Sequence, residues 1–283
     1  MRLPSWLSSH LAALRALLLL TVLLGALYPL AITVVARIPG LRDTANGSLV
    51  SVGGTVVGSA LIGQAFTDAA GHPLVQYFQS RPSAGGYDPT ASGASNLGPE
   101  DVVDAATPSL LTQVCARSKA VGELEHVDGR RPYCTDDGVG AVLAVFHSDG
   151  LTGPVIRAVS INQPCPATPF LASYQGVPVE CASAGVDAAQ AVVTPIRGDA
   201  PAVSAVPPDA VTASGSGLDP DISPAYAALQ APRVAAARNL DVETVQQLID
   251  ERTTGRALGF LGEPTVNVLE LNMELDQSYP YRA

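Results

Sequence analysis

The chain has 283 residues and a formal net charge of −10, from 26 acidic and 16 basic side chains. This acidic balance argues against a nucleic-acid partner, because the phosphates would repel the protein. Lys119 is the only lysine, which nearly excludes chemistry that depends on a lysine, such as a Schiff base or a P-loop.

An uncharged apolar stretch at residues 16–36 is predicted to be a transmembrane helix, because about 20 apolar residues cross the hydrocarbon core of a bilayer. The alternative is a cleaved signal peptide that ends at Val34-Val35-Ala36, but the apolar core of such a peptide is normally shorter. Pro29 is expected to kink the span, because it cannot donate the usual hydrogen bond to the Gly25 carbonyl. Gly25 would let a neighbouring helix approach closely, whereas the alternative is a plain lipid-facing anchor.

Four cysteines, all located after the anchor, bear on the compartment of the remaining chain: Cys115, Cys134, Cys165 and Cys181. An even number in an exported domain predicts disulfides, and all three pairings are open. The alternatives are unpaired thiols in a cytosolic domain, or a zinc site in which His126 and His147 join Cys115 and Cys134 at no standard spacing.

The basic residues around the span do not decide its orientation. Arg2 and Arg15 lie at its beginning and Arg37 and Arg42 follow it, so the positive-inside rule gives a tie. Disulfides would require an oxidising compartment. We therefore expect a single-pass protein of the cell membrane with an extracytoplasmic C-terminal domain.

The chain after the anchor is predicted to be a mixed α+β domain with a β-rich, cysteine-containing insert. In chain order the expected parts are an N-terminal tail (1–15), the transmembrane helix (16–36), the first part of the soluble domain (37–122), the insert (123–206), the second part of the soluble domain (207–276) and a C-terminal tail (277–283).

Local signals predict the main elements before and within the insert. The β-rich runs at 48–52 and 55–62 are joined by Gly53-Gly54, which indicates a hairpin. Thr107-Pro108 is interpreted as the start of a helix that ends near Gly122. In the insert, strands at 140–146 and 154–162 flank an Asp149-Gly150 turn.

The second part of the soluble domain is predicted to be largely helical before a final strand. Ser223-Pro224 begins a helix to about Arg238, and Asp241 begins another. The apolar residues from Val266 to Leu275 alternate with polar ones but change phase, which predicts strands with a bulge.

Two loops rich in small residues are the candidate functional segments. Residues 77–99 have no helical or strand period, and a loop this long within a compact domain is usually functional or disordered. Residues 211–221 contain Gly215-Ser216-Gly217, whose N–H groups would suit a phosphate, although an ordinary flexible turn is the alternative. Asp219 and Asp221 are interpreted as turn and helix-capping residues rather than as paired catalytic carboxylates.

At these residues the chain resembles the C subunit family of the bacterial Kdp potassium-transporting ATPase (KdpC). The resemblance covers most of the chain on both sides of the insert, which is longer than the family's usual link. It rests on TVLLGALYPLAITVVA, NGSLV, GSALIGQAF, YFQSRPSAGGYDPTASGASNLGP, VTASGSGLDPDISPAYAALQAPRVAAARNL and TTGRALGFLGEPTVNVLELN.

The resemblance implies an accessory, non-catalytic subunit of an ATP-driven, high-affinity potassium uptake complex. The implied partners are the lipid bilayer, a channel-like subunit that selects potassium and a P-type ATPase subunit. It also implies a catalytic chaperone that raises the ATP affinity of the ATPase subunit, while the complex handles ATP and potassium and this chain holds no firmly bound cofactor or metal. By analogy with the ABC-transporter signature motif, the nucleotide-related residues would be Ser214, Gly215, Ser216, Gly217 and Gln230.

A domain outside the cell would be separated from ATP by the membrane, and a role in stabilising partners needs no contact with nucleotide. We therefore expect the anchor to pack on the channel-like subunit and the domain to cap the ion entrance. The expected contact residues are Gly25, Pro29, Tyr77, Phe78, Arg81, Tyr87 and Asn96. The alternative is a freestanding membrane-anchored enzyme or binding protein at the cell surface, which the lack of common catalytic motifs disfavours.

Overall fold

The computed structural model describes residues 4–281, so Arg2 and the outermost ends of both predicted tails lie outside the described residues. Its contacts divide the chain into two units, Met1–Leu61 and Ile62–Ala283. The helices and mixed sheets confirm the predicted α+β class. The first division along the chain falls after the first hairpin and not at the end of the anchor.

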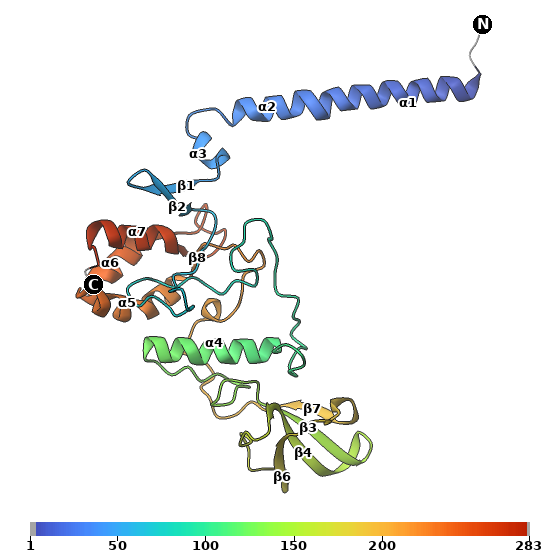
Figure 1. Cartoon of the computed structure of the whole chain (residues 1–283), viewed down its shortest axis with the longest axis vertical. Coiled ribbons are helices and arrows are strands. Elements are labelled where there is room, and N and C mark those ends of the chain that lie inside the picture. Colours follow the sequence, from blue (N-terminus) through green and yellow to red (C-terminus); the bar gives the residue numbers. More distant parts are fainter. Residues whose placement is uncertain (1–3, 282–283) are drawn as a thin grey trace. The chain divides into compact units, whose positions relative to one another are not determined.

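The anchor is one long helix that begins at Ser5, well before the predicted start of the span. Helix α1 (Ser5–Val22) continues through a π-helical turn (Leu23–Leu27) into α2 (Tyr28–Val35) (Figure 1). Among the described residues this is the one helix long and apolar enough to cross a membrane, and none of the span is buried by the rest of the chain. Its apolar surface is therefore open to lipid or to another subunit.

The π-helical turn is the structural response to Pro29. The N–H of Tyr28 donates to the carbonyl of Leu23, five residues earlier, instead of four. Such local adjustments re-satisfy backbone groups around a proline in membrane helices. The π-helical turn therefore contains one residue more than an α-helical turn. This extra residue rotates the side chains of α1 about the helix axis relative to those of α2.

The rest of the first unit is a short helix and the predicted hairpin. Helix α3 (Arg42–Ala45) precedes β1 (Leu49–Val52) and β2 (Thr55–Ser59), which are antiparallel. Gly53 and Gly54 have φ angles of 57° and 84°, as a two-residue hairpin turn requires.

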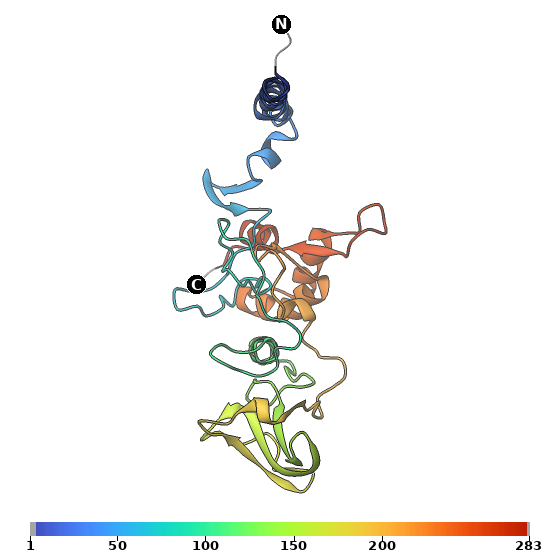
Figure 2. The same ribbon diagram turned by 90° about the vertical axis from the view of Figure 1, so that its right-hand side faces the viewer.

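The core of the second unit is mainly helical. Figures 1 and 2 show α4 between the C-terminal helices and the sheet of the insert. Phe78, Ile249 and Leu271 are among its fully buried side chains. Its helices are α4 (Leu110–Glu125), α5 (Pro224–Arg238), α6 (Val242–Arg252) and α7 (Val268–Ser278), and its small antiparallel sheet has the order β8 (Asp221–Ile222), β10 (Thr265–Asn267), β9 (Thr253–Thr254).

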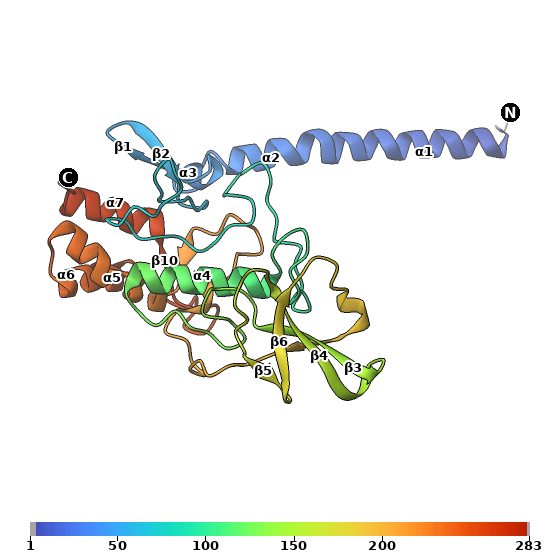
Figure 3. The same cartoon turned by 60° about the horizontal axis from the view of Figure 1, so that its bottom comes forward.

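The insert contains a twisted five-stranded sheet with a small core of its own (Figure 3). The strands lie in the order β5 (Ser173–Tyr174), β6 (Val177–Ala182), β4 (Thr152–Pro164), β3 (Val142–Asp149), β7 (Val192–Pro195). Neighbouring strands are antiparallel except for the parallel β4–β6 pair. The Asp149-Gly150 turn joins β3 to β4, as predicted.

Two disulfides brace this region in different ways. Cys165–Cys181 joins two positions within the insert, whereas Cys115–Cys134 ties α4 to the part of the insert that precedes β3. Because Cys115 and Cys134 are bonded to each other, they are not free thiolates that could hold zinc. The alternative of a zinc site at these cysteines is therefore wrong.

Two predicted element starts are wrong because a side-chain cap lies elsewhere. Helix α4 begins after Ser109, not Thr107, because the Ser109 hydroxyl accepts the Thr112 N–H at 3.1 Å. At the C-terminus, the predicted bulged strand after residue 267 is helix α7. Asn267 accepts the Glu270 N–H at 3.1 Å and so starts this helix.

The start of α5 is predicted correctly, but not the role of the acidic residues before it. Ser223 caps the helix by accepting the Tyr226 N–H at 3.0 Å. The carboxylate of Asp209 in turn accepts the Ser223 N–H at 2.7 Å. Asp219 and Asp221 therefore do not cap this helix, although Asp219 does accept the Asp221 N–H within a tight turn.

Candidate functional site

The two small-residue loops identified in the sequence pair with each other. The Gly93 N–H donates to the Ser216 carbonyl at 2.8 Å, and the Ser83 hydroxyl donates to the Gly217 carbonyl at 2.6 Å. The Gly63 N–H adds a bond to the Leu218 carbonyl at 2.8 Å. We call residues 77–99 and 211–221 the paired loops. The hydrogen bonds between the two loops hold the long loop in a fixed position.

Glycines permit this close approach. A Cβ atom on Gly217, where φ is +69°, would lie 2.7 Å from the Gly93 carbonyl oxygen. A Cβ atom on Gly63 would lie 2.6 Å from the Asp219 carbonyl oxygen and 2.7 Å from the Tyr87 ring. The two distances to carbonyl oxygens are too short for any other residue without a shift of the backbone.

Arg81 links the paired loops electrostatically. Its guanidinium donates to the Asp219 carboxylate at 2.9 Å and to the Thr212 carbonyl at 3.3 Å. The Tyr87 hydroxyl donates to the carbonyl of Arg81. Burial raises the pKa of this phenol, which keeps it protonated as the donor. Arg81 and Tyr87 thus have internal partners, and only part of each side chain faces outward.

The first residues of the long loop are held by two buried amides. The Phe78 N–H donates to Asn272 Oδ1 at 2.8 Å, and Asn272 Nδ2 donates to the Phe78 carbonyl at 3.0 Å. Gln230 makes the equivalent pair of bonds with the backbone of Gln79, at 2.7 and 3.1 Å. Phe78 itself is 0% exposed. A partner cannot reach its side chain, so its prediction as a contact residue is corrected: it is a core residue.

The other predicted contact residues are at least partly accessible. Asn96 is exposed on the long loop, while Gly25 and Pro29 lie on the exposed anchor. Tyr77 is partly buried, and its hydroxyl donates to Asp276 at 2.9 Å while the Arg238 guanidinium lies 5.1 Å from its ring centre.

The predicted nucleotide-related residues divide into an exposed pair and a buried set. Gly215 and Ser216 are exposed at the turn of the second loop, whereas Ser214 and Gly217 are buried. Gln230 is 0% exposed. Its Oε1 accepts from Gln79 and Arg233 and its Nε2 donates to Gln79, so its hydrogen-bonding groups are used inside the domain.

A buried ion pair between Arg233 and Glu125 lies next to Gln230, because Arg233 also donates to Gln230 Oε1 at 2.9 Å. Arg233 Nε donates to the Glu125 carboxylate at 3.0 Å, and the two side chains are 7% and 1% exposed. Arg233 also donates to the carbonyls of Val75 and Tyr77. Burial raises the pKa of Glu125, against the opposing effect of the Arg233 charge. Because the Arg233 guanidinium and the Glu125 carboxylate are paired, we interpret this cluster as structural: it holds the start of the long loop in place.

An exposed apolar hairpin was not predicted as functional. Between β9 and β10 the chain turns back in a projecting loop (Figure 2). Its apolar residues Leu258, Phe260 and Leu261 are 83%, 68% and 51% exposed. Reciprocal backbone bonds between Ala257 and Leu261, both 2.9 Å, fix the turn. The signal was present in the sequence as apolar residues between glycines, bounded by the oppositely charged Arg256 and Glu263, which form an ion pair. We call Leu258, Phe260 and Leu261 the apolar tip.

Comparison with known proteins assigns the chain to a family. The family described as "K+-transporting ATPase, c chain" (KdpC) matches residues 10–136 and 181–277. The chain belongs to the KdpC family. It is therefore an accessory subunit of a potassium-transporting ATPase and not the catalytic one.

Named relatives agree over nearly their whole length. A Potassium-transporting ATPase KdpC subunit of Kineococcus radiotolerans is 40% identical over 266 residues, which cover 93% of this chain and 91% of the relative. Proteins of the same name from Rhodospirillum rubrum and Mycobacterium tuberculosis are 38% and 37% identical, over 92% and 94% of this chain and 91% and 97% of theirs.

The unmatched part of the chain lies inside the predicted insert. Residues 137–180 lie between the two matched blocks, within the segment 123–206 predicted from the sequence. The high coverage in both directions means that these relatives have a similar length. The matched blocks contain most of the anchor, both paired loops and the apolar tip.

Proposed function

We propose that this subunit stabilises the assembled pump through its anchor and its extracytoplasmic domain. The anchor packs against the channel-like, potassium-selecting subunit, and the domain covers the ion entrance of that subunit. The P-type ATPase subunit is the third member of the complex. The disulfides support the extracytoplasmic orientation, because they persist in oxidising compartments.

The apolar tip is the observation that carries the proposal. Exposed Leu and Phe side chains that gather on one projection typically mark a contact surface. Leu258 has a φ angle of 54°, a conformation that costs a leucine free energy. A strained and exposed leucine does not stabilise the isolated domain. A partner surface that contacts Leu258 would explain why a leucine stands at this position.

The second part of the proposal concerns ATP. We propose that the subunit raises the ATP affinity of the ATPase subunit indirectly, by holding the complex in its competent state, as a catalytic chaperone without a nucleotide site of its own. The occupied amide of Gln230 supports an indirect effect, since a nucleotide would have to displace its bonds to Gln79.

The test uses the whole complex with variants of the apolar tip. Leu258→Asn removes the apolar side chain and places asparagine where a positive φ is better tolerated. The soluble domain should stay as stable as wild type, while co-purification of the other subunits falls and the ATP concentration needed for half-maximal hydrolysis rises. Val203→Ser is the matched control, because Val203 is 85% exposed but lies outside the tip.

Two results would contradict the proposal. One is full recovery of the complex with Leu258→Asn and with Phe260→Ser. The other is equal loss with Val203→Ser, which would mean that any exposed apolar residue matters. A changed ATP dependence in a fully assembled complex would support direct nucleotide contact instead of an effect through assembly.

A further inference from the structure

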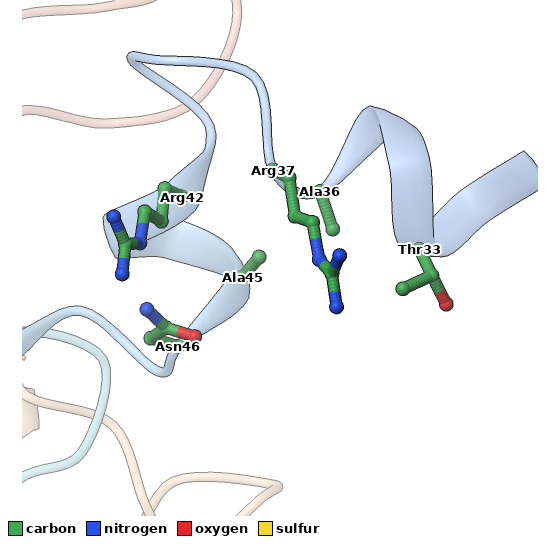
Figure 4. Close-up of a pocket in the computed structure, with 6 residues that line it drawn as sticks. All are labelled: Thr33, Ala36, Arg37, Arg42, Ala45 and Asn46. Atoms are coloured by element: carbon green, nitrogen blue, oxygen red, sulfur yellow. The ribbon is translucent and has the colours of Figure 1, made fainter.

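A polar cavity lies at the end of the anchor, within the first unit. Figure 4 shows its lining residues, which come from the last turns of the anchor and from α3. The cavity has a volume of about 550 Å³ and is lined by Thr33, Ala36, Arg37, Arg42, Ala45 and Asn46. Its polar lining therefore consists of two guanidinium groups, one carboxamide and one hydroxyl, with no carboxylate.

Among the described residues, the two arginines of this cavity have no acidic partner, which is also true of Arg15, Arg117, Arg131 and Arg197. Within residues 4–281, no carboxylate lies at ion-pair distance from Arg37 or Arg42. Arginines that do have such a partner are Arg81, Arg130, Arg157, Arg233, Arg238, Arg252 and Arg256. Two guanidinium groups at one cavity, with no carboxylate in its lining, make the cavity electropositive and so favour an anion.

Of the remaining polar groups, only the Asn46 amide can donate to an anion. The Thr33 hydroxyl cannot, because it donates its proton to the Pro29 carbonyl at 2.7 Å. Asn46 ends α3, and its side-chain amide lines the cavity and supplies two N–H donors. Asp43, the acidic residue of α3, is not part of the lining.

The position along the chain indicates which anion. Arg37 is the first charged residue after the uncharged stretch 16–36, so in a spanning helix it emerges at the level of the lipid headgroups. In the orientation proposed above, Arg37 and Arg42 lie on the outer side, where the positive-inside rule does not favour basic residues. A phosphate at that level supplies a reason for them, because guanidinium groups bind phosphate oxygens in a bidentate manner.

We propose that this cavity binds the phosphate of an anionic phospholipid headgroup, with Arg37 and Arg42 as charge partners and the Asn46 amide as an additional donor. The bound lipid fixes the depth of the anchor where it leaves the membrane. The proposal rests on the membrane anchor and on the proposed extracytoplasmic orientation of the domain, but not on the contacts proposed for the apolar tip or for the other subunits.

The test is native mass spectrometry of the full chain in mild detergent, with phosphatidylglycerol and phosphatidylcholine as competing lipids. The wild-type chain should retain phosphatidylglycerol preferentially. The double variant Arg37→Gln, Arg42→Gln should bind it at least about tenfold more weakly, since two charge-assisted contacts are lost. Arg15→Gln is the control, because Arg15 is an exposed arginine of the anchor helix outside the cavity.

Asn46→Asp is a second, nearly isosteric variant for the case in which the double variant does not fold. It places a carboxylate in the cavity and should also weaken phosphatidylglycerol retention. Inorganic phosphate, titrated against the lipid-free chain, distinguishes the source of the anion: it should bind more weakly than the lipid. Phosphate binding as tight as that of the lipid, unchanged retention in the variants, or equal loss in Arg15→Gln would overturn the proposal.

Discussion

The side-chain amide of Gln230 and the backbone of Gln79 form a two-bond pair across the core of the soluble domain. Oε1 accepts the Gln79 N–H at 2.7 Å, and Nε2 donates to the Gln79 carbonyl at 3.1 Å. Asn272 does the same for the preceding residue, Phe78. Side chains from α5 and α7 thus bond to the backbone N–H and carbonyl groups at the start of the long loop, as the backbone of a neighbouring strand would do in a sheet.

This arrangement predicts a large loss of stability for Gln230→Ala. The backbone N–H and carbonyl of Gln79 would both be left unsatisfied, and a cavity would form beside them, for a loss of about 2–4 kcal/mol. Denaturant unfolding of the full chain in detergent measures the effect. Gln246→Ala is the control, since the Gln246 amide bonds to Asp250 one turn along an exposed face of α6, and it should change stability by less than about 0.5 kcal/mol.

Asp221→Asn is expected to change the pH dependence of stability. The pKa of Asp221 is raised, first by burial and then by repulsion from Asp219. The native state therefore holds this proton more tightly than the unfolded state, so the unfolding free energy falls as pH rises from the ordinary carboxyl value of 3.8 through the raised pKa. Asparagine keeps an oxygen that can accept the bond from Asn267.

The variant should therefore gain stability relative to wild type as the pH rises above the ordinary carboxyl value of 3.8, with the difference levelling off once the pH has passed the raised pKa. Unfolding at a series of pH values measures this. Asp199→Asn is the control, because the Asp199 side chain is 97% exposed. A difference that does not depend on pH would show that the Asp221 carboxyl is not responsible.

The two disulfides should be reduced in a fixed order. Cys165 is exposed, whereas Cys115 is 1% exposed in the core. A mild reductant followed by differential alkylation should therefore label Cys165 and Cys181 first. Loss of that bridge is expected to cost the insert about 3 kcal/mol and to raise its hydrogen exchange before that of α5–α7. Labelling of Cys115 first would contradict the structure.

Pro29→Leu should weaken assembly without unfolding the soluble domain. Leucine restores an N–H and allows a regular α-helical turn, which removes the extra residue of the π-helical turn and rotates α1 relative to α2 by about 100°. Recovery of the complex should fall while the melting temperature of the domain stays unchanged. Ile32→Leu is the control within the same helix. Recovery equal to wild type would show that this rotation is not used in assembly.

Elements with a local signal were predictable from the sequence. Gly53-Gly54 marks the first hairpin, because both glycines take positive φ angles, and Ser223-Pro224 marks the start of α5. The apolar residues after Asn267 fit two periods at once. Leu269, Leu271 and Leu275 alternate as in a strand, but with Val268 they also recur on the buried face of α7. The Asn267 side chain, which caps the helix, favours the helix over the strand. A pattern of apolar residues alone does not reveal this polar cap.

Features that depend on distant contacts were missed. Phe78 lies in a loop by its sequence but is buried, because α5 and α7 supply the amides that hold its neighbourhood. The pairing of the two small-residue loops likewise depends on Gly93 and Gly217 meeting across a long separation in sequence. Glycine content indicated flexibility, whereas the structure uses it for close approach.

The most direct test of the proposed function is isolation of this chain from its native membrane in mild detergent under potassium limitation, with the co-purifying proteins identified by mass. Recovery of a multi-span channel-like protein together with a P-type ATPase is the predicted result. Recovery of this chain alone, under conditions that keep other membrane complexes intact, would contradict the account.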